Sequence, residues 1–153
     1  MTWLVIANTN NCRIYGFEKN AKKLTLIKEF NDPDAKLKNL DLSSDKEGHY
    51  QTSNARRGAY SPAESPKDVE VEHFAREIAK ELDAQRRLNS YDNLIIVAAP
   101  HMNGLISQHL NEQVKKMIIE NILKDYNSLP DHELIKVLNH YHEEKYNSKK
   151  QGL

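Results

Sequence analysis

The side chains best suited to recognise another molecule are concentrated between residues 45 and 60 of this 153-residue chain. They are charged, amide-bearing or aromatic: Asp45, Lys46, His49, Tyr50, Gln51, Asn54, Arg56, Arg57 and Tyr60. Adjacent arginines can each form forked contacts with phosphate or carboxylate, and tyrosines can stack on exposed bases. The residue types therefore suit contact with RNA.

Charge limits this interpretation. Between residues 41 and 60 the formal charge is zero, because three acidic residues balance three basic ones: Asp41, Asp45, Glu47, Lys46, Arg56 and Arg57. The whole chain is balanced as well, with 22 basic and 22 acidic residues, so no overall field attracts nucleic acid or an anionic membrane. Three hypotheses stay open for this stretch: a contact with RNA or the ribosome, a contact with another protein, and a solvated loop without a ligand.

The other reactive residue types form no catalytic or metal-binding pattern. His101 and His109 are eight residues apart, about two helical turns, which is too far for a metal site with so few ligands. Cys12 beside Arg13 is either a thiolate activated by the neighbouring cation or a cysteine packed in the core, and the core is favoured. Gly-x-Ser-x-Gly, Gly-x-Gly-x-x-Gly and Walker loops are missing from the sequence, so we expect no catalytic residue of these classes, no metal and no cofactor.

The apolar run at residues 94–99 is the element around which the fold is expected to form. It has no polar face, which indicates a central strand covered by helices on both sides. Pro100 is expected to end this strand, and apolar residues at helical spacing then predict a helix over residues 103–116. Ligands of open α/β sheets gather at such carboxyl ends of strands.

Three strands are predicted before this run, over residues 3–7, 12–17 and 24–30. The connection at residues 9–11 contains two asparagines, which tolerate positive φ, so a tight hairpin is expected there. The three strands form an antiparallel meander, and the later central strand is expected to run parallel to the first.

The connection that follows is unusually long, since residues 31–68 show no sustained periodicity apart from a possible short helix after Asp32 and Pro33. Residues 41–68 are expected to be a long loop. Two overlapping signals, at Ser61 and Ser65, each place a hydroxyl cap before a proline, so a helix should start by Ser65 or soon after. Its apolar stripe covers the sheet: Val71, Phe74, Ala75, Ile78 and Leu82.

The last third of the chain predicts one more strand and one more helix. Residues 116–123 suit either a continued helix or a strand, and the strand is favoured. A final helix is expected with Asp131 as its cap, followed by a polar, basic and disordered tail over residues 145–153. The fold class is α/β, a single domain over residues 1–144 with one mixed sheet and helices on its faces.

Composition points to the cytoplasm. A single cysteine rules out an internal disulfide and fits a reducing compartment. The apolar stretch at residues 3–7 is far shorter than a signal-peptide core, and no apolar run approaches the length that spans a membrane. Export and membrane association are therefore not expected.

Several segments together resemble a known family: the meander, Ser-Asp-Lys-Glu-Gly-His at residues 44–49, the helix at 74–82, the strand and proline at 94–100, and Lys124-Asp125. Over about residues 3–141 the chain resembles the bacterial host attachment protein family. That family is similar to the middle domain of archaeal and eukaryotic peptide-chain release factors, so the resemblance implies a ribonuclease-H-like mixed α/β fold and supports a strand at 116–123.

The resemblance also implies what the long loop does. In release factors the matching loop carries Gly-Gly-Gln and helps to hydrolyse peptidyl-tRNA, whereas this chain has Gly48-His49-Tyr50-Gln51 and Arg56-Arg57-Gly58. A glycine pair allows backbone conformations that residues with a Cβ cannot adopt, so a catalytic role is not expected. Two hypotheses follow: a non-catalytic relative that binds the ribosome or structured RNA through residues 45–60, or a protein-interaction factor with an indirect role in attachment to host cells or surfaces.

Overall fold

The computed structural model describes residues 1–18, 22–32 and 65–151, with side chains as far as Tyr141. The nine side chains named between residues 45 and 60, the possible helix after Pro33 and the Ser61 start signal all lie outside these ranges.

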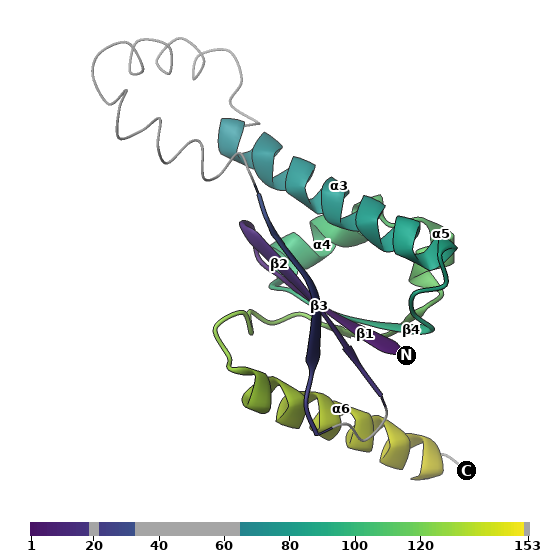
Figure 1. The fold of residues 1–153 in the computed structure, drawn as a ribbon. Helices are drawn as coiled ribbons and strands as arrows, with labels where there is room; N and C mark the ends of the chain where they lie inside the picture. Colours follow the sequence, from purple (N-terminus) through teal and green to yellow (C-terminus); the bar gives the residue numbers. More distant parts are fainter. Residues whose placement is uncertain (19–21, 33–64, 152–153) are drawn as a thin grey trace, which may run out of the picture.

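One five-stranded mixed sheet organises the described chain, as predicted (Figure 1). Its strands are β1 (Thr2–Ala7), β2 (Asn11–Phe17), β3 (Thr25–Asn31), β4 (Asn93–Val97) and β5 (Ile118–Ile122), in the order β3-β2-β1-β4-β5. The meander is confirmed, because β2 pairs antiparallel with both β1 and β3. The central strand β4 is parallel to β1, also as predicted, and β5 is parallel to β4. The strand interpretation of residues 116–123 is therefore correct.

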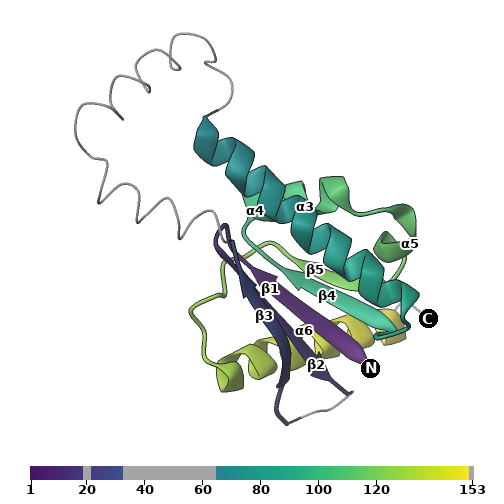
Figure 2. The ribbon, with the colours of Figure 1, turned by 45° about the horizontal axis from the view of Figure 1, so that its top comes forward.

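Helices cover both faces of the sheet (Figure 2). On one face lie α3 (Pro66–Arg87), α4 (Pro100–His109) and α5 (Glu112–Lys115), and on the other lies α6 (Asp131–Gln151). Two cores result, one on each side. The face under α3 buries Ile14 and Ile96, and the face under α6 buries Leu4 and Val97. Because β4 contributes to both cores, its sequence is apolar at every position after Asn93.

The start of α3 follows directly from its local sequence. Ser65 is the N-cap, its hydroxyl accepts a hydrogen bond from the Asp68 amide at 3.1 Å, and the Asp68 carboxylate accepts one from the Ser65 amide at 3.4 Å. Pro66 occupies the first turn, where its missing N–H leaves no hydrogen bond unmade. The predicted apolar stripe of this helix is buried throughout. Residues 66–68, expected in the long loop, are its first turn.

The prediction for the segment after β4 was wrong in two respects. The helix begins at Pro100 and not at residue 103, since Pro100 has the φ of a first helical residue and Ala99 is the N-cap. The expected single helix is also two, because α4 ends at His109 and α5 begins at Glu112. Asn111 makes the break: its side-chain oxygen accepts a hydrogen bond from the Val114 amide at 2.9 Å and caps the second helix.

Two terminal details also differ from prediction. Asp131 is the first residue of α6 and not its cap, and the helix continues to Gln151, so residues 145–151 of the expected disordered tail are helical. The β1–β2 turn does form, but with no positive φ at Thr9, Asn10 or Asn11. Instead the Asn8 side chain accepts hydrogen bonds from the amides of Asn10 and Asn11 at 2.8 and 2.7 Å.

Candidate functional site

The structure shows where the predicted binding loop joins the folded chain. On its amino-terminal side β3 ends at Asn31 and is followed by the buried Asp32, and on its other side the chain returns at Ser65. Both junctions lie at the same end of the domain, next to the thin grey trace (Figure 1). Beside them β3 and α3 enclose a pocket of about 450 Å³.

The pocket is lined equally by the two elements that flank the loop. Its lining residues are Lys28, Phe30, Asn31 and Asp32 from the end of β3, and His73, Phe74, Glu77 and Glu81 from α3. Volumes of this size are typical of small-ligand pockets. The sequence indicated the loop as a candidate site, but it did not indicate this pocket beside the loop junctions.

Strand and helix periodicity explain why these side chains face one another. Lys28 and Phe30 are paired with Ile14 and Cys12, whose side chains are buried under α3, so alternation along β3 points both toward that helix. On α3, His73, Glu77 and Glu81 follow at intervals of four residues and share one face. The spacing of the lining side chains is thus regular within each element, but only the packing of α3 against β3 brings the two sets of side chains together.

Two phenylalanines form the apolar part of the pocket. The ring of Phe30 meets the ring of Phe74 edge to face, with centroids 5.8 Å apart and planes at 71°. Phe74 is buried in the core and Phe30 packs against that core while partly exposed. This geometry anchors the pocket on the rigid part of the domain.

The polar part of the pocket is negatively charged. The described lining residues include three carboxylates, those of Asp32, Glu77 and Glu81, and one ammonium group, that of Lys28, so their formal charges sum to −2 with His73 neutral. Lys28 Nζ lies 3.0 Å from Glu81 Oε1, and His73 Nε2 lies 4.0 Å from Glu77 Oε1. Lys28 Nζ also lies 5.8 Å from the centre of the Phe30 ring. The pocket therefore already holds one cation between a carboxylate and an aromatic face.

Cys12 takes no part in this chemistry, which confirms the core interpretation. The side chain is buried, and burial, followed by the nearby Glu81 carboxylate, raises the pKa of its thiol to about 12. Arg13 points to the opposite face of the sheet, where its guanidinium donates to the Asn127 carbonyl at 2.6 Å and to the Tyr15 hydroxyl at 3.0 Å. The neighbouring cation therefore cannot activate the thiol.

The histidine pair singled out by spacing is not brought together. His101 is exposed, while His109 Nε2 approaches Glu72 Oε1 at 3.5 Å across the α3–α4 contact. Within the described parts of the chain, no group of three His, Cys, Asp or Glu side chains is arranged to hold a metal ion.

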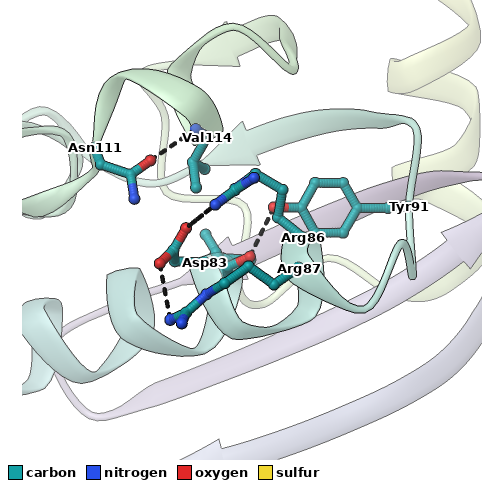
Figure 3. A network of polar contacts seen from close by, with 7 residues as sticks. Asp83, Arg86, Arg87, Tyr91, Asn111 and Val114 are labelled. Carbon is teal, nitrogen blue, oxygen red and sulfur yellow. Dashed lines mark hydrogen bonds and ion pairs between the residues drawn. The ribbon is translucent and has the colours of Figure 1, made fainter.

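A second polar cluster, at the far end of α3, holds helices together (Figure 3). Asp83 accepts contacts from Arg86 at 2.9 Å and Arg87 at 3.0 Å. Its pKa is lowered, first by a hydrogen bond from the Asn111 side chain and then by Arg86 and Arg87. Nearby, the Tyr91 hydroxyl donates to the Leu82 carbonyl at 2.7 Å. Because these groups pair with one another, we interpret the cluster as a structural contact between α3 and the start of α5. The three-and-four-residue spacing of Asp83, Arg86 and Arg87 could have indicated the ion pairs, but not the partner Asn111.

Across residues 1–18, 22–32 and 65–151, none of the helices is both long enough and apolar enough to cross a bilayer.

Comparison with known proteins places the chain in a family. A family model described as "Protein required for attachment to host cells" matches residues 3–138. The chain is also similar to the uncharacterized protein RP470 of Rickettsia prowazekii (strain Madrid E), with 35% identity over 78 residues. That match covers 50% of this chain and 52% of the relative, so it spans about half the length of each. Since the family model covers most of the chain, this protein belongs to the family of proteins required for attachment to host cells.

Proposed function

We propose that this chain is a non-catalytic binding protein of the cytoplasm, related to the middle domain of peptide-chain release factors, that contacts the ribosome or structured RNA through residues 45–60. One observation carries the proposal: the long segment containing these residues leaves and re-enters the domain at one end, from two well-formed elements, β3 and α3. Binding residues are often found on loops that a rigid scaffold positions in this way.

The topology adds support. An antiparallel meander continued by two parallel strands, with helices on both faces, is the type of mixed sheet expected of a ribonuclease-H-like domain. The family description speaks of attachment to host cells and not of translation, so the proposed relation to release factors rests on the sequence resemblance and on this topology.

The proposal excludes peptide release. Gly-Gly-Gln occurs nowhere in the sequence, and the matching stretch contains His49 and Tyr50 in place of a second glycine. A Cβ at these positions restricts the backbone conformations that a glycine pair would permit.

Ribosome co-sedimentation tests the proposal. The double variant Arg56→Ala/Arg57→Ala should lose most ribosome association at low salt, and wild-type association should fall steeply as salt is raised, because phosphate contacts release counterions. The matched control is Arg76→Ala/Lys80→Ala, which removes the same charge from exposed positions of α3. Equal association of both double variants with wild type would remove residues 56 and 57 from any ribosome contact.

A second candidate function, binding of a protein partner, is favoured by the charge of the pocket. Phosphate would be repelled by the carboxylates of Glu77 and Glu81 in the pocket, whereas a basic protein surface would be attracted. On this candidate the chain contributes to attachment indirectly, through the protein that it binds. This candidate would be supported if the protein still bound ribosomes at high salt but did not bind purified ribosomal RNA.

A further inference from the structure

The pocket between β3 and α3 has a feature that identifies its ligand class. The ammonium group of Lys28, a described lining residue, lies 3.0 Å from the Glu81 carboxylate and 5.8 Å from the centre of the Phe30 ring. We propose that this pocket binds an arginine side chain of a protein partner, whose guanidinium takes the place of the Lys28 ammonium. The proposal concerns a site distinct from residues 45–60 and does not depend on ribosome binding.

Charge favours a cationic guest. When Lys28 is paired with Glu81, the carboxylate of Glu77 still gives the solvent-facing part of the pocket a negative charge, with His73 neutral. The Glu77 side chain is 53% exposed, so a guest can reach it from solvent. An anionic guest would meet the Glu77 and Glu81 carboxylates, and among the described lining residues Lys28 alone carries an ammonium or guanidinium group.

The shape of the polar groups favours arginine over other cations. Glu77 and Glu81 are one helical turn apart on α3, so their carboxylates can be contacted by two edges of one planar guanidinium. Guanidinium groups also stack on aromatic rings, and the partly exposed Phe30 supplies one. The methylene groups of the guest would lie against the Phe30–Phe74 pair.

Lys28 can give up its position at little cost. Its side chain is 47% exposed, so its ammonium group can turn into water when a guest enters. Exposed ion pairs of this kind contribute little to stability. Lys28 is thus an internal competitor for the site, and its removal should strengthen binding.

Backbone amide chemical shifts of the full-length protein provide the test. The probes are N-acetyl-arginine amide, its uncharged near-isostere N-acetyl-citrulline amide, and inorganic phosphate. The arginine probe should shift the amides of Phe30, Asn31 and Glu77 in a saturable manner, and the other two probes should leave them in place. Equal shifts with citrulline, or shifts of these amides with phosphate, would overturn the proposal.

Three substitutions sharpen the test because their expected effects have opposite signs. Glu77→Gln and Glu81→Gln should each weaken arginine binding by about two- to fivefold, the range expected for single exposed charge pairs. Lys28→Met should tighten binding by a similar factor. Glu112→Gln removes an exposed carboxylate on α5, 80% exposed and outside the pocket, and should leave binding unchanged. All four positions are exposed or partly exposed, so the variants should fold.

A Lys28→Met variant that binds no more tightly than wild type, or a Glu112→Gln variant that weakens binding as much as Glu77→Gln, would contradict the assigned site. These measurements use no ribosomes. Loss of ribosome association in the Arg56→Ala/Arg57→Ala variant and failure of arginine binding in the pocket are therefore separate results.

Discussion

At the residue scale, the position of Cys12 determines its reactivity. Burial raises the pKa of the thiol to about 12, so at pH 8 only about one molecule in ten thousand carries the thiolate that reacts with disulfide reagents. We expect the native protein to react with such a reagent at least a hundredfold more slowly than the unfolded protein in denaturant. Because the pKa of Cys12 is raised in the folded state, its contribution to stability should be constant below pH 9 and should be lost as the pH rises above it. Equal rates in the native and unfolded protein would contradict the buried position.

Ile96 tests the core at the same scale. Its side chain is fully buried in β4 under α3, so Ile96→Ala should lower the free energy of unfolding by roughly 2 to 5 kcal/mol through lost burial and a residual cavity. The same change at Ile119, which is 40% exposed on β5, is the control and should cost under about 1 kcal/mol. Denaturant titration measures both. Similar values for the two variants would mean that β4 is not central to packing.

At the element scale, the contact between α3 and the start of α5 depends on one carboxylate. Asp83 contacts Arg86 and Arg87, and the hydrogen bond from Asn111 is the first cause of its lowered pKa. A carboxyl whose pKa is lowered on folding stabilises the folded state above its unfolded pKa, near 3.8, and this stabilisation is lost as the pH falls through the folded value.

We therefore expect Asp83→Asn to melt at a lower temperature than wild type at neutral pH. The difference should shrink as the pH is lowered past 3.8. Thermal melting at several pH values measures it, with Glu133→Gln on α6 as a control that removes a carboxylate on the other face of the sheet. A difference that is independent of pH would show that the Asp83 charge does not stabilise this contact.

At the scale of the whole molecule, the proposed relation to release factors does not extend to their chemistry. The release-factor loop that helps to hydrolyse peptidyl-tRNA carries Gly-Gly-Gln, and this chain lacks Gly-Gly-Gln. We expect the purified protein to release no peptide from ribosome-bound peptidyl-tRNA, measured against a release factor as positive control. Release that disappears with Gln51→Ala would restore a catalytic function.

The sequence by itself determined the elements, because their signals are local. Strand alternation and the apolar run before Pro100 predicted the sheet, and the Ser65-Pro66-Asp68 signal predicted the start of α3 within a residue. Both depend on side chains no more than a few positions apart.

The split between α4 and α5 also has a local cause, the Asn111 cap, which the apolar periodicity of the segment did not reveal. Tertiary structure alone decided three further features. The end of α3 meets the start of α5 through Asp83 and Asn111, and burial under α3 raises the pKa of the Cys12 thiol to about 12. The pocket brings Lys28 and Phe30 together with Glu77 and Glu81. About fifty residues of chain separate the two pairs, and they include residues 45–60, the predicted binding loop. Local patterns can state which face each element buries, but the distance between two faces is set only when the elements pack, which is why the pocket could not be predicted.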